Sequence, residues 1–300
     1  EDGIRDLVRS RGLGDVYKRQ EQILVRDATR QWVKEYVSPI IEDCNLKGVF
    51  PKELIKGIAE IGGFGAILPA KYGGSELDLI SYGLMMQELE RGDSSIRVMC
   101  SIQTSLVMNN IYEHGNDFHK QEFLLKLSKG ELIGSFGLSE PGHGSDPASM
   151  QTRHAIDGDY YIINGSKMWI GNAPFCDIAL VWSKAADNRY SCFIIHRDDP
   201  GFSTSKIDKK WSFRASETGE LIFDNCKVHK KYLLYESDSI QSALSSLNIA
   251  RYAVACGSIG IAMECYDVAL KYSNERIQFG KKISSNQLIQ KKLVDMLSTV

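Results

Sequence analysis

The sequence predicts an α+β fold with three consecutive parts: a helical domain, a β-domain and a second helical segment. Apolar residues recur at steps of three and four over residues 21–131, as in amphipathic helices. Short β-rich runs separated by turns replace them over residues 132–234, and the helical period returns over residues 235–300. Because strands and helices come in separate blocks rather than in alternation, a Rossmann fold is disfavoured.

Residues 1–20 break with this pattern, because charged residues and glycines alternate there without an apolar stripe. The segment lacks the apolar region of a signal peptide, and it mixes acids with its arginines, unlike a transit peptide. Back-translation of Asp15–Gln20 as GAT GTG TAT AAG AGA CAG resembles the end of a transposase-based sequencing adaptor. We therefore interpret residues 1–20 as a sequencing or assembly artefact, with a natural disordered arm as the alternative.

The first helical domain, residues 21–131, is expected to contain several helices punctuated by Pro and Gly. Pro39 ends the first helix, and Pro51 suits the first turn of the next one. Ser75 is a possible N-cap for the helix that follows it. The later helices are expected at Leu77–Glu90, Arg97–His114 and Phe118–Ser128.

The β-domain, residues 132–234, is expected to be antiparallel, because hairpin-type turn signals separate its short runs. In residues 235–300, a helix that is apolar on more than one face is expected to be buried, and Gly257 and Gly260 would permit close packing by a neighbour. A second helix reaches Val300 without a stop signal, so we expect only the first part of a C-terminal helical bundle.

The composition excludes several classes of function. Lys and Arg number 36 against 38 Asp and Glu, a net charge of −2, which gives no basic field for nucleic acid. The seven cysteines and six histidines show no metal-ligand spacing, so no metal site is predicted, and scattered thiols fit a reducing compartment. No run approaches the roughly 18 apolar residues of a membrane span, so none is expected.

Two glycine-containing motifs lie close together in the β-domain. The loop FGLSEPGHGSD, Phe136–Asp146, carries Gly142 and Gly144, whose backbone freedom lets successive N–H groups converge on an anion or a carbonyl edge. An elaborate turn is the alternative. In KMWIGNA, one hairpin later, Trp169 could wall the pocket of a planar heterocycle or belong to the β-domain core. The helix that a dinucleotide fingerprint requires does not follow the loop.

These motifs belong to a longer ordered set: FGLSEPGHGSD, NGSKMWIGNAPFCD, NIARYAV, NERIQFG and NQLIQKKLVDML. The set resembles the acyl-CoA dehydrogenases over residues 21–300. Within that family the likeness is closest to glutaryl-CoA dehydrogenase, in ELERGDSSIR, QTSLVM, GELIGSFGL, SDPASMQTR and RASETG. The resemblance implies an N-terminal helical domain, a middle β-domain and a C-terminal helical bundle, with FAD as cofactor and a homotetramer as the assembly.

The resemblance also implies roles for residues of these motifs. Leu138 and Ser139 would lie at the pyrimidine edge of the flavin, and Trp169 would face the isoalloxazine ring. Arg276 and Gln287 would meet the FAD of a neighbouring subunit, where the planar fork of an arginine suits a pyrophosphate; an ordinary surface arginine is the alternative. The full set of implied FAD-binding residues is Phe136, Leu138, Ser139, Gly144, Ser145, Trp169, Ile170, Gly171, Arg276 and Gln287.

An acyl-CoA site is implied at Glu90, Arg97, Val98, Ser145, Asn248 and Arg251. Arg97 would bind the distal carboxylate of a dicarboxyl-CoA, because a positive charge at the end of the pocket selects one; an ion pair with Asp93 is the alternative. Two positions depart from the family pattern. Val98 replaces the serine of the glutaryl branch, and Gly171 replaces the threonine whose hydroxyl meets flavin N5.

The implied reaction is FAD-dependent α,β-dehydrogenation of glutaryl-CoA or a related short-chain acyl-CoA, with electron-transfer flavoprotein as the acceptor. A carboxylate removes the α-proton and the β-hydride goes to the flavin. The glutamate that serves as base in the family is expected beyond Val300, so no catalytic residue is assigned within the chain, which alone is expected to be inactive. A short-chain acyl-CoA oxidase and a catalytically inactive flavin- or CoA-binding homologue are the alternatives. The expected location is a bacterial cytoplasm, or the mitochondrial matrix in a eukaryote.

Overall fold

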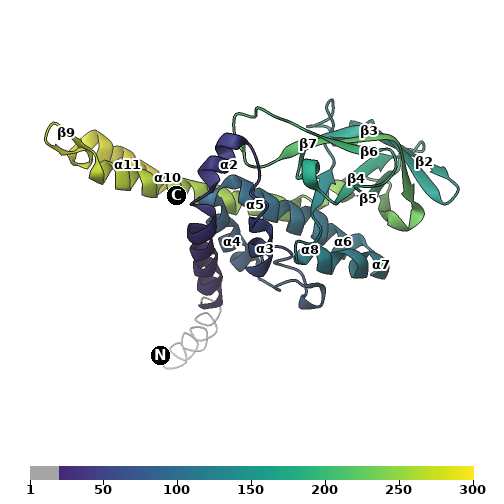
Figure 1. Cartoon of the computed structure of the whole chain (residues 1–300), viewed down its shortest axis with the longest axis horizontal. Coiled ribbons are helices and arrows are strands. Elements are labelled where there is room, and N and C mark those ends of the chain that lie inside the picture. The colour runs from purple at the N-terminus through teal and green to yellow at the C-terminus, as the bar shows by residue number, and fades with distance from the viewer. Residues whose placement is uncertain (1–19) are drawn as a thin grey trace, which may run out of the picture.

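The structure, a computed structural model, describes residues 20–300, and its three parts are visible in Figure 1. The N-terminal helices occupy the centre of the view, the sheet lies to one side of them, and α10 and α11 form an arm that points away from the sheet. The predicted α+β fold, with helices, a β-domain and helices again, is confirmed. The interpretation of residues 1–20 as an artefact lies, except for Gln20, outside the described residues.

The N-terminal helices follow the predicted order, but one predicted cap is wrong. The Asp78 carboxylate accepts a hydrogen bond from Ser81 N at 2.6 Å, so Asp78 rather than Ser75 caps the helix that follows. Asp93 caps the next helix through Ser95 N at 2.7 Å. After the helix at residues 20–32 come η1 (Val33–Val37), α2 (Ile41–Lys47), α3 (Leu54–Glu60), α4 (Leu79–Gly92), α5 (Ser94–Ser101), η3 (Ile102–Met108), α6 (Asn109–His114), α7 (Asp117–His119), η4 (Lys120–Leu124) and α8 (Leu125–Ser128), where η1, η3 and η4 are π-helical.

The sheet is mixed rather than wholly antiparallel, which corrects the prediction. Its strands are β1 (Gly134–Gly137), β2 (Arg153–Asp157), β3 (Tyr160–Gly171), β4 (Ile178–Lys184), β5 (Tyr190–His196), β6 (Phe202–Lys206), β7 (Thr218–His229) and β8 (Leu233–Ser237). The order is β6-β7-β3-β2-β4-β5-β8, and β1 runs parallel to β4. Parallel pairing is possible because a long excursion through β2 and β3 separates β1 from β4, whereas turn signals predict only the tight antiparallel hairpins.

One face of the sheet packs on the helices and the other face has a core of its own. Leu180 and Ile194 of the central strands β4 and β5 belong to the same buried cluster as Met86 and Ile96 of α4 and α5. Val181 and Phe193, which alternate with them, join the second cluster across the sheet. The position of the β-domain relative to the helices is therefore set by a shared apolar core.

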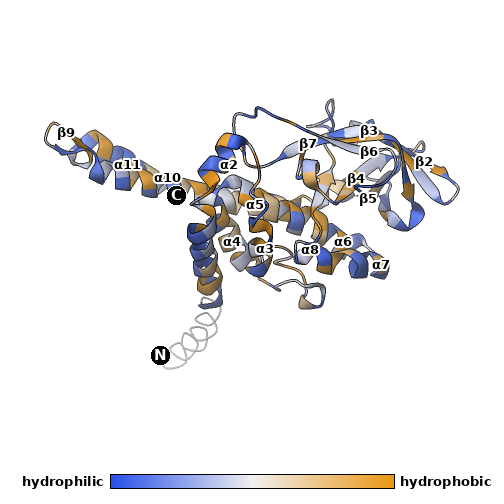
Figure 2. Ribbon diagram, viewed as in Figure 1, coloured by the Kyte–Doolittle hydropathy of each residue, from blue (hydrophilic) through white to orange (hydrophobic). Residues whose placement is uncertain are grey.

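The C-terminal part is an arm built on α10 (Asn248–Glu275), which follows α9 (Gln241–Ser245) and leads through the hairpin β9 (Ile277–Gln278) and β10 (Lys281–Lys282) to α11 (Gln287–Thr299). Contrary to the prediction, most of α10 is not buried. By length and composition, residues 241–275 could cross a membrane, and only 17% of their most apolar window is buried, so the expected absence of such a segment is not upheld. Figure 2 shows apolar residues alternating with polar ones along this arm.

Candidate functional site

Trp169 is the aromatic residue of the motif KMWIGNA and lies at a turn of the β-domain. A register shift between Lys167 and Ile170 interrupts the pairing of β3 with β7, and Trp169 adopts a φ of 64° at this bulge. Its side chain is 61% exposed, so Trp169 is not part of the β-domain core. Asn172 fixes the end of the turn, because its Nδ2 donates to Gly134 O at 3.1 Å. The bulge therefore orients the Trp169 indole toward solvent.

The glycine-containing loop lies against the same turn. Met168 N donates to Ser139 O at 2.9 Å, which joins the root of the loop to the residue before Trp169. Phe136 and Leu138 are buried and anchor the loop, whereas its outer residues are exposed. A methyl group added at Gly142 or Gly144 would meet no atom within 4 Å, so open space lies beside both glycines. Loop and indole together border a surface that is free to receive a planar, partly anionic group.

A buried ion pair lies beneath the loop. The Lys167 ammonium is 2.9 Å from Glu140 Oε1 and also donates to Leu138 O at 3.2 Å, and the Lys167 side chain is fully buried. Burial raises the pKa of Glu140, but the Lys167 charge, the backbone N–H of Gln151 and the hydroxyl of Thr152 outweigh it and hold the pKa at about 2. Burial lowers the pKa of Lys167 to about 8 while Glu140 opposes that shift, so both groups are charged at neutral pH.

The turn also touches the N-terminal helices, at Gly171. A methyl group on Gly171 would lie 2.3 Å from Ile102 Cδ1 and 4.0 Å from Val98 Cγ1. The space that a side chain at residue 171 would need is therefore occupied by an isoleucine of η3. This contact brings Gly171, a predicted flavin residue, next to Val98, a predicted substrate residue.

Arg97 is buried in α5 and pairs with Glu90 of α4, not with Asp93, so the predicted alternative pairing is wrong. Asp93 is engaged elsewhere, because besides capping α5 it accepts from Asn45 Nδ2 at 2.7 Å. Glu90 also accepts from Ser94 Oγ at 2.5 Å. Within residues 20–300, the Arg97 guanidinium makes its hydrogen bond through Nε alone, which leaves its two terminal nitrogens for another acceptor.

The helix α10 covers the Arg97–Glu90 pair and carries two further predicted substrate residues, Asn248 and Arg251. A methyl group on Gly257 would lie 2.7 Å from Glu90 Oε2 and 3.1 Å from Arg97 Nε, so α10 packs directly on the pair. Asn248 and Arg251 lie exposed on the first turns of α10, where Arg251 Nη1 donates to Asn248 Oδ1 at 3.3 Å. The structure thus places all of Glu90, Arg97, Asn248 and Arg251 on α10 or on the helices against it.

Arg276 and Gln287 do not join this site within one chain. Both are exposed, and they lie at the far end of the 28-residue helix α10 and at the start of α11. At about 1.5 Å of rise per residue, the path along α10 from Arg251 to Arg276 spans roughly 38 Å. Both residues thus lie far from the first turns of α10, and their contact with the cofactor of a neighbouring subunit stays a prediction.

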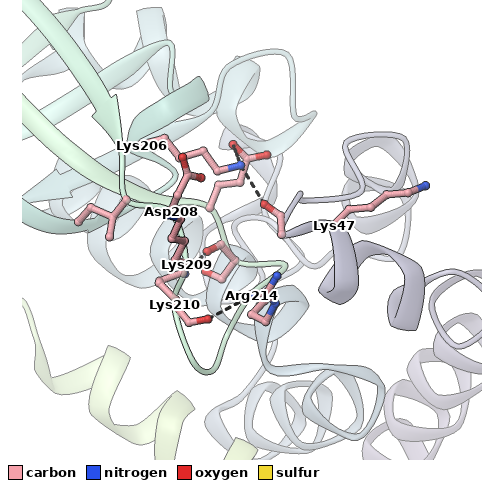
Figure 3. A pocket seen from close by; sticks show the side chains of 10 residues that line it. Lys47, Lys206, Asp208, Lys209, Lys210 and Arg214 are labelled. Carbon is pink, nitrogen blue, oxygen red and sulfur yellow. Dashed lines mark hydrogen bonds and ion pairs between the residues drawn. The ribbon is translucent and has the colours of Figure 1, made fainter.

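A cluster of basic residues that the sequence analysis did not single out joins the helical domain to the β-domain beside the turn. Figure 3 labels the basic residues Lys47, Lys206, Lys209, Lys210 and Arg214, together with Asp208 among them. Arg214 Nε donates to Asn45 O at 2.8 Å and Lys206 Nζ donates to Gly48 O at 2.8 Å, so these cations bind carbonyls at the end of α2. The segment that carries these basic residues continues into β7, where Thr218 pairs with Gly171. In the sequence, the charged run KIDKK and the arginine that opens RASETG indicate this cluster.

Comparisons with known proteins bear on this site. Residues 19–131, 135–226 and 240–300 match the family models described as acyl-CoA dehydrogenase N-terminal, middle and C-terminal domains. An acyl-CoA dehydrogenase of Bacillus subtilis is 35% identical over 282 residues, which cover 92% of this chain and 74% of the relative. A glutaryl-CoA dehydrogenase of Desulfococcus multivorans is 35% identical over 286 residues, covering 92% and 73%. The structure of a Mycobacterium smegmatis glutaryl-CoA dehydrogenase in complex with FADH2 has a TM-score of 0.89 at 38% identity, covering 92% of this chain and 71% of that one.

Fold and matches define a flavin-dependent oxidoreductase architecture. The chain belongs to the acyl-CoA dehydrogenase family, and FAD is its cofactor. The outward-facing indole of Trp169 and the open space beside Gly142 and Gly144 fit such a group, which has a planar ring and an anionic tail. Among residues 20–300, no group of three or more His, Cys, Asp or Glu side chains converges on a point that could hold a metal.

Proposed function

We propose that the protein catalyses FAD-dependent α,β-dehydrogenation of an acyl-CoA thioester, with glutaryl-CoA or a related short dicarboxyl-CoA as substrate. The observation that carries the substrate class is Arg97, which is buried, is held by Glu90 through Nε, and keeps two terminal nitrogens for an acceptor. A carboxylate suits that planar fork, because it can accept two parallel hydrogen bonds. An uncharged acyl chain would leave the donors without partners, which disfavours it.

FAD supplies the hydride acceptor for this reaction. Leu138 and Ser139 hold the edge of the flavin site, Trp169 covers the ring, and Ile170 anchors the turn from the core. Gly144 and Ser145 present backbone and hydroxyl donors to the phosphates and to the CoA portion, and Phe136 holds the loop in the sheet. Arg276 and Gln287 reach the FAD of a neighbouring subunit in a homotetramer.

The acceptor is proposed to be electron-transfer flavoprotein. Among the similar structures is one titled electron transferring flavoprotein of Acidaminococcus fermentans, with a TM-score of 0.88 at 34% identity. A second candidate activity, an acyl-CoA oxidase, is favoured by Gly171 and Ile102. A methyl group of Ile102 occupies the space that a hydroxyl-bearing side chain at residue 171 would need. The environment of the flavin ring is therefore less polar at this position.

The substrate proposal is tested by binding rather than turnover. The purified chain is loaded with FAD, and perturbation of the flavin absorbance reports the affinities of glutaryl-CoA and butyryl-CoA. Arg97→Lys keeps the charge beside Glu90 but loses the fork, so we expect glutaryl-CoA affinity to fall about tenfold while butyryl-CoA affinity stays within twofold. Equal losses for both ligands, or a wild-type preference for butyryl-CoA, would refute the dicarboxylate assignment. Peroxide production in air on addition of acyl-CoA, measured on a longer protein that carries the expected catalytic glutamate, would decide for the oxidase.

A further inference from the structure

The ion pair between Lys167 and Glu140 lies at the root of the glycine-containing loop, not in the middle of either apolar core. The Lys167 side chain is fully buried, and Glu140 is 4% exposed. The Glu140 carboxylate accepts from Gln151 N at 2.6 Å and from Thr152 N at 2.9 Å. Thr152 Oγ1 donates to Glu140 Oε1 at 2.6 Å as a further bond. Every one of these contacts joins the loop to a strand or to the segment leading into one.

Burying a lysine ammonium costs desolvation free energy, so the buried position of Lys167 requires an explanation. Replacing a buried ion pair with apolar residues of similar volume is often neutral or stabilising, which means that stability alone does not require Lys167. Its ammonium also donates to Leu138 O at 3.2 Å, and Leu138 is the residue at which the chain leaves β1. Beyond Glu140 the loop is held by reciprocal backbone bonds between Glu140 and His143, at 3.2 Å each, and by bonds from Ser149 to Asp146 at its end.

We propose that Lys167 is a positioning residue for the cofactor: with Glu140 it fixes the backbone of Leu138–Glu140 in the conformation from which the exposed loop binds FAD. The inference rests on the proposed assignment of this loop to FAD. Met168 N, which donates to Ser139 O, is the neighbour of Lys167 in β3, so one strand fixes both consecutive carbonyls, those of Leu138 and Ser139. Trp169 follows in the same strand, and the loop and the indole are thereby held in a fixed relation.

Removing the ammonium has a defined structural consequence. Lys167→Met keeps the length of the side chain but leaves Leu138 O without its donor and Glu140 without its countercharge. Both groups would then seek water, and the root of the loop would open. The double variant Lys167→Met, Glu140→Gln removes the unpaired charge but still leaves Leu138 O without a donor. The two roles therefore predict different FAD affinities for the double variant: a positioning role predicts that the affinity stays low, and a purely structural role predicts that it recovers.

The test combines hydrogen exchange with FAD titration of the 300-residue chain. Lys184→Met is the matched control, because Lys184 also lies in a strand and donates to a backbone carbonyl, Ala148 O at 3.4 Å, outside the loop. Amide exchange of residues 138–146 in the absence of FAD should rise in Lys167→Met and in the double variant, but not in Lys184→Met. FAD affinity should fall about tenfold or more in both Lys167 variants, while far-UV circular dichroism stays that of the wild type in the double variant.

The outcomes separate the hypotheses. Wild-type FAD affinity in a folded Lys167→Met chain, or recovery of FAD affinity in the double variant, would overturn the positioning role. If Lys167→Met does not fold, the FAD affinity of the double variant alone decides between the two roles. If the wild type binds no FAD, the assignment of the loop to the cofactor fails; the exchange data still decide whether Lys167 fixes the loop, because they are recorded without FAD.

Discussion

Gly260 of α10 lies against the backbone of α4, and a methyl group there gives a prediction with a definite sign. The Cβ of Gly260→Ala would lie 2.0 Å from the carbonyl oxygen of Gln87 and 2.8 Å from its carbonyl carbon. Cβ atoms do not approach other heavy atoms closer than 3.0 Å, so the two helices must separate locally by 1.0 Å, the difference between 3.0 and 2.0 Å. Both partners are helical backbone, so no side-chain rotation relieves the contact.

Two opposing energies decide the outcome. Alanine is about 1 kcal/mol more favourable than glycine inside a helix. Overpacking of a close contact costs up to about 3 kcal/mol where nothing can rotate away. We therefore expect Gly260→Ala to lose about 2 kcal/mol of unfolding free energy, the difference between the two.

Urea denaturation followed by circular dichroism measures this difference, with Ser258→Ala on the exposed side of the same helix as the control. The control should stay within about 0.5 kcal/mol of the wild type. A Gly260→Ala chain more stable than the wild type by about 1 kcal/mol would show that helix propensity acts alone and that α10 does not lie on α4 as described.

Three further predictions follow from single contacts. Burial lowers the pKa of His154 from 6.5 to about 4, so between these pH values the unfolded chain binds a proton that the folded chain does not. The free energy of unfolding should therefore fall as the pH drops from 6.5 towards 4. In urea denaturation, His154→Phe should lose this pH dependence of the midpoint. Arg30 binds the fully buried Glu88 carboxylate at 2.9 and 2.8 Å, so Arg30→Met should cost about 3 kcal/mol in urea denaturation, and Arg30→Met with Glu88→Gln should cost less. Gly171→Thr should destabilise the chain by about 1–3 kcal/mol and Ile102→Val, which removes Cδ1, should recover part of that loss; additive effects in the double-mutant cycle would contradict the contact.

The parts of the fold that depend on local pattern were predictable from the sequence. Helices with a clear 3.6-residue period and the turns between strands depend on neighbours in the chain. Gly257 and Gly260 were expected to permit close packing, and the structure identifies the partners, the Arg97–Glu90 pair and the backbone of α4. The parallel pairing of β1 with β4 was missed, because local turn signals carry no information about strands that pair over a long excursion.

The candidate site was likewise predictable only where it depends on local sequence. Trp169 was equally compatible with the core and with a pocket wall, and only the bulge, which depends on the pairing of β3 with β7, decides for exposure. Arg97 could pair locally with Asp93, but Asp93 is occupied as the cap of α5, and Glu90 takes its place. Lys167 gave no signal at all, because a lysine in a strand ordinarily indicates a solvent-facing position and its partner Glu140 lies 27 residues away.

The contact of Gly171 with Ile102 has a consequence for specificity. Ile102 directly follows α5, the helix that carries Arg97 and Val98, and Gly171 ends the strand that carries Lys167 and Trp169. The proposed carboxylate-binding end and the proposed flavin-facing turn therefore meet through one van der Waals contact rather than through a flexible linker. Since packed interiors transmit small displacements, added side-chain volume at residue 171 must displace the Ile102 side chain, α5 or the turn. Substitutions made to alter acyl preference in α5 should for this reason also alter the environment of the flavin, and the two properties will not be separable at this position.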